Sequence, residues 1–163
     1  MTEGTKSVLF GCHSIIHSYY VIRAWKYLYN RYPKFWQIVC ILLHDIGHVG
    51  LDYLKYENQK KIHWVLGAQI SQMLFGRKAF LFCAGHTKDS GYNINSQFKK
   101  ADKYSSVIAS NLWLKWNYKV EDFGRPFVPN QWKKKVLENL NNDKDNHELY
   151  LELIEETTNE KSK

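Results

Sequence analysis

The segment ILLHDIGHVG (41–50) places two histidines and an aspartate at the end of an aliphatic run. Polar and ionisable side chains are tolerated in apolar surroundings when they are hydrogen-bonded or bound to a metal ion. His44, Asp45 and His48 therefore need partners elsewhere in the chain. Imidazole and carboxylate groups are common ligands of divalent transition metals, so this segment indicates a candidate metal centre.

Further candidate ligands are spread over the first two thirds of the chain. Six of the seven histidines fall within the first 86 residues, each in or beside an apolar segment. A single such histidine is more often a satisfied structural side chain than a ligand, but converging helices can bring several to one point. The candidates are His13, His17, His44, Asp45, His48, His63, His86 and Asp102.

The types of side chain in this set indicate which metal ions it would bind. Histidines and carboxylates without a thiolate suit one or two ions of Mn, Fe, Co, Ni or Zn, and they disfavour a structural zinc site built on cysteines. His13 and His17 lie one helical turn apart, so either could be the ligand from that segment.

The elements that must position these residues are predicted to be helices. Apolar residues recur at three- and four-residue steps, which is typical of amphipathic helices, and no alternating strand pattern is visible. The expected helices cover 11–30, 35–44, 62–74, 101–118, 132–140 and 148–156. Residues 79–84 form a short apolar segment, 89–96 a loop with turns, and 124–129 an extended connection. These patterns predict an all-α single domain.

Two apolar stripes are expected to face the core. Between 62 and 74 the helical spacing is given by Ile62, Val65, Leu66, Gln69, Ile70, Met73 and Leu74. In the segment 111–119, Leu112, Trp113 and Trp116 also follow helical spacing, and such aromatic stripes usually pack in a core. Unpaired aromatic residues there would instead indicate a homodimer face.

Composition and length favour a globular protein of the cytoplasm. A chain of 163 residues with 44% hydrophobic content is long enough for one sizeable core. Cys12, Cys40 and Cys83 are odd in number and lack CxxC spacing, which is typical of reduced core thiols. The N-terminal segment has no signal-peptide core, and no apolar run approaches the length of a membrane span. We therefore expect no membrane partner.

The charge is distributed unevenly. Residues 138–163 contain eight acidic and three basic residues, so their net charge is −5, whereas the remaining 137 residues carry +12. A basic body attracts phosphorylated ligands or nucleic acid. A lysine-rich solvated surface is an equally good interpretation of the charge alone.

Five segments together resemble the HD-domain superfamily of metal-dependent phosphohydrolases. They are HSYYVI (17–22), LLHDIGH (42–48), HWVLGAQI (63–70), GHTKDSG (85–91) and KADKYSSV (100–107). Their order matches the family signature H…HD…H…H…D and covers roughly residues 11–118. The resemblance implies an HD-domain helical bundle over 1–120, followed by a helical extension over 121–163 with a frayed acidic tail.

The resemblance also implies a role for each residue. His17, His44, Asp45 and Asp102 would hold one metal ion, and Asp45 would bridge to a second ion held by His63 and His86. A metal-bound water would then attack phosphorus in a phosphate ester or anhydride, with a nucleotide as the favoured substrate and nucleic acid as a weaker candidate. Lys88 would bind the phosphate, and Lys103, Arg23 and Lys61 are further candidates for that contact.

His48 bears on the choice between branches of the family. HDIGH is similar to the deoxynucleoside triphosphate triphosphohydrolases, in which the second histidine acts as a proton donor or relay; an ordinary imidazole pKa suits that work. A supporting role, in which His48 only orients a ligand, is an equal alternative. The chain departs from that branch at Val49-Gly50, where Pro-Phe is usual, and it lacks the GYP segment of cyclic-dinucleotide phosphodiesterases.

Two other functions fit the same ligands. HD-type mixed-valent di-iron oxygenases share the signature, and one phosphonate-cleaving branch is similar in carrying a histidine just after the HD pair; their substrates are small phosphonates or polyols. A degenerate HD module could bind a nucleotide or nucleic acid without turnover, but all the ligand positions are present. The hydrolase is favoured because the segments around the ligands resemble those of the HDIG branch.

Overall fold

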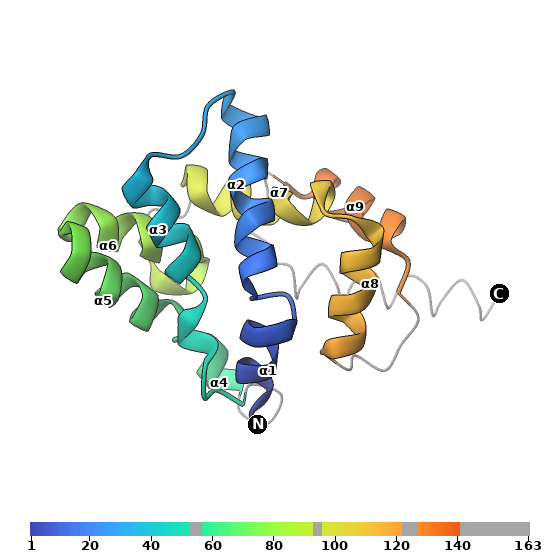
Figure 1. The fold of residues 1–163 in the computed structure, drawn as a ribbon, viewed down its shortest axis with the longest axis horizontal. Coiled ribbons are helices and arrows are strands. Elements are labelled where there is room, and N and C mark those ends of the chain that lie inside the picture. Colours follow the sequence, from blue (N-terminus) through green and yellow to red (C-terminus); the bar gives the residue numbers. More distant parts are fainter. Residues whose placement is uncertain (53–56, 93–95, 122–126, 141–163) are drawn as a thin grey trace.

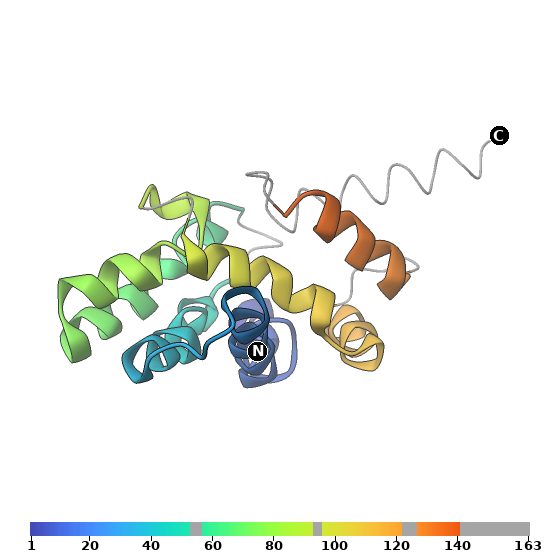
Figure 2. The ribbon, with the colours of Figure 1, turned by 90° about the horizontal axis from the view of Figure 1, so that it is seen from above.

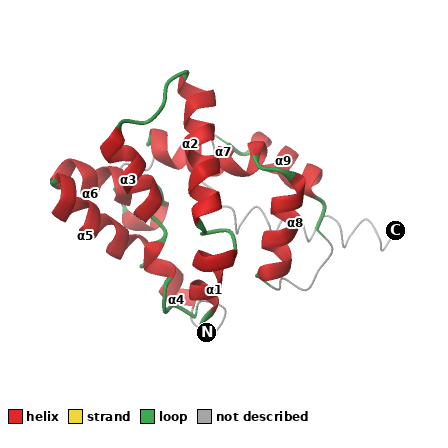
Figure 3. Ribbon diagram, in the orientation of Figure 1, coloured by secondary structure: helices red, strands yellow, loops and turns green. Residues whose placement is uncertain are grey.

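The structure is a computed structural model that describes residues 1–52, 57–92, 96–121 and 127–140. All regular secondary structure in these ranges is helical (Figure 1, Figure 3), which confirms the predicted all-α class. None of these helices has an apolar stretch of the length that crossing a bilayer requires. The α-helices are α1 (Glu3–Phe10), α2 (Ile15–Tyr29), α3 (Phe35–Leu43), α4 (Glu57–Lys60), α5 (Trp64–Phe75), α6 (Arg77–Ala84), α7 (Gln97–Ile108), α8 (Asn111–Val120) and α9 (Pro129–Glu138), with short 3-10 helices η1 (Ile46–His48) and η2 (Lys88–Ser90).

The arrangement is organised around α2 and α7, which pack against each other. In Figure 1, α3, α5 and α6 lie on one side of α2, while α8 and α9 lie on the other. Seen from above, α7 extends from the α5–α6 side of the molecule towards α8 and α9 (Figure 2). The helix α7 therefore ties the two sides together.

Three apolar clusters hold these helices in place. The central cluster joins α2, α3 and α7 around the buried Trp25 and Phe98. A second cluster joins α8 and α9 around Trp113 and Trp132. A third lies between α3, α5 and α6 and consists of small side chains: Cys40, Ala68, Ala79, Cys83 and Ala84. Because small residues allow close approach of helix backbones, this third cluster draws α3, α5 and α6 tightly together.

The first predicted helix, 11–30, begins later in the structure, as α2 (Ile15–Tyr29). Residues 11–14 form a turn, and a separate helix, α1, precedes it. The side chain of Thr2 accepts a hydrogen bond from the Thr5 backbone and caps α1, and Ser14 has the extended conformation of a helix N-cap. The prediction of one helix from residue 11 was wrong because both helices on either side of this turn begin at N-capping residues.

The predicted helix 101–118 is divided between α7 and α8. Ala109 is extended, and the Ser110 side chain accepts a hydrogen bond from the Trp113 backbone at 3.1 Å, which starts α8 as a new helix. Lys133 Nζ donates to the Ala109 carbonyl at 2.6 Å and satisfies the carbonyl at the break. In α8, Trp113 is buried as predicted, but Leu112 and Trp116 are exposed.

Most of the apolar stripe of the third predicted helix faces away from the core. In α5 the buried residues are Gly67, Ala68 and Ser71. Of the apolar stripe, Val65 and Ile70 are half-buried, whereas Met73 and Leu74 are exposed, together with Leu66 and with Ile62 just before the helix. The prediction was wrong because close packing of α5 on α3 and α6 requires small side chains, and these lie on the opposite face from the large apolar ones.

Residues 79–84, which we predicted only as a short apolar segment, belong to α6, and the helix around Trp132 is confirmed as α9. The predicted helix 148–156 and the acidic tail lie outside the described residues, as do 93–95 of the predicted loop and 124–126 of the extended connection. The helix α9, from the predicted extension, shares the second apolar cluster with α8.

Candidate metal centre

Histidines and aspartates from five parts of the chain meet between α2, α3, α5, α6 and α7. His17 lies on α2 and Asp102 on α7. His44, Asp45 and His48 follow α3, through its C-cap and the short helix η1. His63 is the N-cap of α5, and His86 follows the C-cap of α6.

Two glycines allow these segments to approach one another. A Cβ atom on Gly67 would lie 2.4 Å from the carbonyl oxygen of Leu43, and one on Gly47 would lie 1.7 Å from the carbonyl oxygen of His63. Both distances are far below van der Waals contact. Any other residue at either position would therefore push the end of α3 away from the start of α5, and with it His44 away from His63.

The first half of the cluster gathers around one oxygen of Asp45. Asp45 Oδ2 lies 3.0 Å from His44 Nε2 and 3.7 Å from His17 Nε2. Asp102 Oδ1 lies 2.8 Å from His17 Nε2 and 3.7 Å from His44 Nε2. With metal–ligand distances of about 2.1 Å, two ligands of one ion lie about 3.0 to 3.4 Å apart. His17, His44 and Asp45 form a group whose ligand atoms all lie within 4.8 Å of one another, and Asp102 contacts both of its histidines.

The second half gathers around the other oxygen of the same carboxylate. Asp45 Oδ1 lies 3.8 Å from His86 Nε2 and 3.8 Å from His48 Nε2. His86 Nε2 lies 3.0 Å from His63 Nε2. Asp45, His63 and His86 form a second group of buried side chains whose ligand atoms are close enough to hold a metal ion. The two oxygens of Asp45 therefore face two different groups of imidazoles.

The orientation of two rings is fixed by the nitrogen that faces away from the cluster. His44 Nδ1 lies 2.6 Å from the Ile41 carbonyl oxygen, and His86 Nδ1 lies 2.7 Å from the Cys83 carbonyl oxygen. Since a carbonyl only accepts hydrogen bonds, each Nδ1 carries the proton. In a neutral ring this leaves the lone pair on Nε2, which faces the cluster. The same arrangement orients histidine ligands in metalloproteins.

The side chains of the cluster differ in their exposure to solvent. His44 and His48 are almost fully buried, whereas the side chains of His17 and Asp102 keep 12% and 20% of their surface exposed. The cluster therefore reaches solvent on the side where α2 meets α7. The ring of Trp113 lies nearly parallel to that of His17, with centroids 6.4 Å apart.

The buried groups change one another's pKa. Burial favours neutral His44, but the Asp45 carboxylate and contacts with Asp102 outweigh burial and raise the pKa of His44 to about 10. Burial likewise opposes ionisation of Asp45, but His44 and His13 hold the pKa of Asp45 well below its usual range. Burial and the neighbouring histidines lower the pKa of His86 to about 3, and they also hold the pKa of His48 well below its usual range. At neutral pH the cluster thus contains ionised carboxylates and the neutral imidazoles of His48 and His86, the forms that bind cations, whereas His44 is protonated and would have to release its proton to bind an ion.

Two buried atoms support cation binding more directly. His44 Nε2 and Asp102 Oδ1 make no hydrogen bond of acceptable geometry in the described part of the chain, although each lies close to groups of opposite charge. Buried polar atoms are nearly always hydrogen-bonded or bound to an ion. His44 Nε2 lies 3.0 Å from Asp45 Oδ2, and Asp102 Oδ1 lies 2.8 Å from His17 Nε2, so a bound ion would give both atoms a partner of good geometry.

His48 lies within the cluster itself. Its ring is stacked between those of His13, at a centroid distance of 3.8 Å, and His63, at 4.4 Å. Its Nε2 is as close to Asp45 as that of His86.

Lys88, the favoured candidate for phosphate contact, begins η2 and is half-buried, two residues beyond His86. Among the other candidates for phosphate contact, Arg23 is on the exposed face of α2 and lies over the Tyr19 ring.

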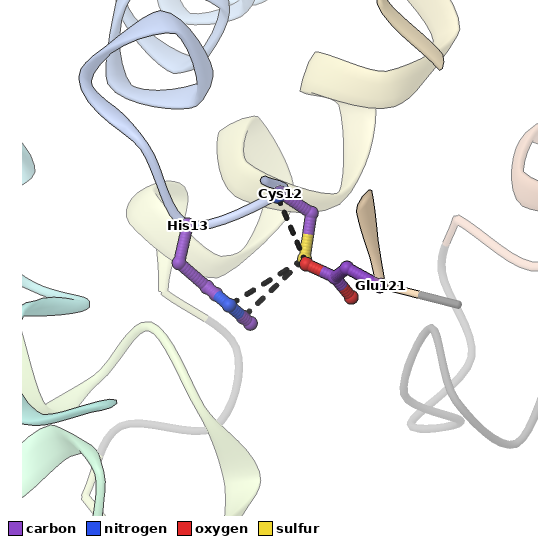
Figure 4. Close-up of side chains that lie close together, drawn as sticks. All are labelled: Cys12, His13 and Glu121. Atoms are coloured by element: carbon purple, nitrogen blue, oxygen red, sulfur yellow. Dashed lines mark hydrogen bonds between the residues drawn. The ribbon is translucent and has the colours of Figure 1, made fainter. Parts of the chain in front are cut away.

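A separate cluster adjoins this centre at the turn before α2, and it includes two residues that the sequence patterns did not indicate as ligands. Cys12, His13 and Glu121 come together there (Figure 4). Glu121 is the C-cap of α8, and its only sequence signal is an acidic residue at the end of a basic helix. Cys12 was expected in the apolar core, where Cys40 and Cys83 do lie. All three cysteines are free thiols, as predicted.

Four cationic side chains line a cavity that lies away from the histidine–aspartate cluster. A cavity of about 600 Å³ is lined by Arg31, Lys34, Arg77 and Lys78 beside the ring of Trp36. Lys34 and Arg77 lie at the N-terminal ends of α3 and α6, whereas His44 and His86 lie at the C-terminal ends of the same helices. A helix rises about 1.5 Å per residue, so this cavity is roughly 12 to 15 Å from the histidines.

Comparisons of the chain with protein-family models, with curated proteins and with solved structures give no match. The cluster itself is therefore the basis for any assignment of function.

Proposed function

We propose that the protein is a metal-dependent phosphohydrolase of the HD type, with two divalent cations held by the histidine–aspartate cluster. The observation that carries this proposal is the position of Asp45, whose two carboxylate oxygens face two groups of imidazoles. A carboxylate with one oxygen in each ligand set can bridge two ions, and paired metal ions about 3.5 to 4 Å apart stabilise the attacking and leaving oxygens in hydrolytic centres.

The roles of the residues follow from this geometry. His17, His44 and Asp102 would complete the first ligand set and His63 and His86 the second, with Asp45 common to both. Cations held there would lower the pKa of a coordinated water to near neutrality and so supply a hydroxide nucleophile. The Nδ1 hydrogen bonds to Ile41 and Cys83 keep the rings in place during turnover.

His48 would act beside the second ligand set, formed by Asp45, His63 and His86. Because its ring is buried between two other imidazoles and its pKa is lowered, it suits proton acceptance or cation binding better than proton donation. The substrate would approach from the exposed side of His17 and Asp102. We infer a small phosphorylated molecule, with a nucleotide as the favoured class, and Lys88 as a phosphate contact.

The test is a panel of substrates and metals. The protein freed of metal by chelation is reloaded with Mn, Fe, Co, Ni or Zn and offered nucleoside mono- and triphosphates, cyclic dinucleotides and phosphonates. Metal-dependent release of phosphate or of a nucleoside monophosphate supports the proposal. Turnover that needs iron and molecular oxygen, with a near-ultraviolet iron band, would replace it with the oxygenase. An inactive panel with stoichiometric metal would leave a binding module as the better description.

A further inference from the structure

We propose that Cys12, His13 and Glu121 form a second metal site, separate from the histidine–aspartate centre and selective for a zinc-class ion. The three side chains supply one sulfur, one nitrogen and one oxygen donor, and these donor atoms lie within 4.8 Å of one another. Figure 4 shows the Cys12 sulfur and the His13 ring directed at each other, with the Glu121 carboxylate beside them.

The distances agree with a shared ion. Cys12 Sγ lies 3.5 Å from His13 Nδ1 and 3.7 Å from His13 Nε2. With metal–ligand distances of about 2.3 Å for sulfur and about 2.1 Å for nitrogen, two tetrahedral ligands lie about 3.6 Å apart. The Cys12 and His13 side chains therefore need little movement to bind one ion.

Hydrogen bonds decide which atoms would bind. The Ser7 hydroxyl has one proton, and it donates that proton to Glu121 Oε1. Its 2.6 Å contact with His13 Nδ1 must then be donated by the ring, which leaves the lone pair of a neutral His13 on Nε2. The Cys12 backbone also donates to Glu121 Oε1, at 3.0 Å. Both hydrogen bonds therefore end on Oε1, and Oε2 can serve as the oxygen ligand.

The ligand set selects the class of ion. A thiolate with an imidazole and a carboxylate favours zinc over Mg, Ca or Mn, which prefer oxygen ligands alone. Three protein ligands leave one tetrahedral position for water or a substrate group, as in catalytic rather than structural zinc sites. The site would also join the α1–α2 turn to the end of α8, since Glu121 comes from the latter.

This assignment separates the roles of His13 and His17. His17 contacts Asp102 and belongs to the histidine–aspartate centre. His13 stacks on His48 and has a ligand atom within 4.8 Å of Asp45 and His48 as well as of Cys12 and Glu121, so it lies between the two clusters, and the proposal assigns its Nε2 to the thiol side. An ion on Cys12 would therefore lie directly beside the second half of that centre, with one imidazole between them.

Cobalt(II) provides a specific test, because a cobalt–thiolate bond gives an intense near-ultraviolet charge-transfer band that imidazole and carboxylate ligands do not give. The metal-free full-length protein is titrated with Co²⁺, with and without competing Zn²⁺. We expect the band in the wild type, its loss on addition of Zn²⁺, and its loss in Cys12→Ser. The control Cys83→Ala, in the apolar core, should keep the band.

Two further variants make the test decisive. Asp45→Ala, which removes the proposed bridge of the other centre, should keep the thiolate band, so the two proposals fail independently. Glu121→Gln retains the hydrogen-bond acceptor on Oε1 and should keep the fold, but it should shift the visible cobalt spectrum and weaken binding. A wild type without the band, or a band that persists in Cys12→Ser, overturns the site and leaves a hydrogen-bonded network.

Discussion

Asp102 Oδ1 on α7 lies 2.8 Å from His17 Nε2 on α2, although these residues come from opposite ends of the predicted HD region. This contact brings the last ligand position to the first, and His17 in turn lies 3.7 Å from Asp45 Oδ2. The contact matters for the proposed function because the first ligand set is complete only if α2 and α7 pack in this register. Their packing is provided by Trp25, Phe98 and their neighbours in the central cluster.

Replacement of Asp45 by alanine should abolish metal binding at both ligand sets, because the residue contributes one oxygen to each. The bound metal, measured by elemental analysis after gel filtration, should fall to the content of the thiol site alone, and phosphatase activity should disappear with it. Asp89→Ala, on the exposed helix η2, is the matched control. Full metal content in the Asp45 variant would contradict the bridging role.

Replacement of His86 by glutamine should remove one ion and leave the other. His86 contacts only the Oδ1 side of Asp45, whereas His17 and His44 contact the Oδ2 side. We expect the metal content of the centre to fall from two ions per chain to one. His147→Gln changes the one histidine that follows position 86 in the sequence and should leave the content unchanged. An equal loss of both ions would indicate a single cooperative site.

Replacement of His48 by alanine should slow turnover by roughly 10²- to 10⁴-fold, the usual contribution of a general acid–base residue. The metal content should stay near that of the wild type, because the other ligands of the second set remain. Rates and metal content must be measured on the same preparation. A normal rate would reduce His48 to a supporting side chain, and parallel loss of metal would make it a ligand.

Much of the site was predictable because its ligands are marked by local patterns. The pair His44-Asp45 ends an aliphatic run, and His17 and Asp102 lie on helices with clear apolar periodicity. The all-α class followed from the same periodicity. Convergence of the ligands could be expected from the resemblance, but their distances depend on tertiary packing and could be seen only in the structure.

The missed features depend on interactions that apolar periodicity does not record. A hydrophobic stripe predicts which face of a helix is buried only when large apolar side chains make the contacts, and α5 packs through Gly67, Ala68 and Ser71 instead. The break at Ser110 is a local capping interaction that periodicity does not detect. The contact between Glu121 and the α1–α2 turn joins distant segments without a motif.

Replacement of Gly67 by alanine should destabilise the protein and weaken metal binding together. Alanine favours helices over glycine by about 1 kcal/mol, but the added methyl would lie 2.4 Å from the Leu43 carbonyl oxygen, a backbone atom that cannot move alone. Overpacking of this kind costs about 1 to 3 kcal/mol, so the net change is a loss of stability. Urea unfolding measures it, with Gln69→Ala on the exposed face of α5 as control. A Gly67→Ala variant that is more stable than the wild type would show that α3 and α5 can move apart without loss of stability.

Removal of two positive charges from the basic cavity should weaken binding of polyanions without changing the metal content. The chain has no acidic residue between positions 4 and 44 or between 58 and 88, so Arg77 and Lys78 lie in a region where nothing on the same helices offsets their charge. One charge contact is worth about 1 kcal/mol in water, and the double variant Arg77→Ala/Lys78→Ala should raise the Kd for inorganic triphosphate by roughly 10- to 30-fold. Calorimetry at low and high salt measures this change, and Lys115→Ala/Lys119→Ala on α8 removes the same charge elsewhere. An equal effect of both double variants would show that net charge alone, and not this cavity, attracts phosphorylated ligands.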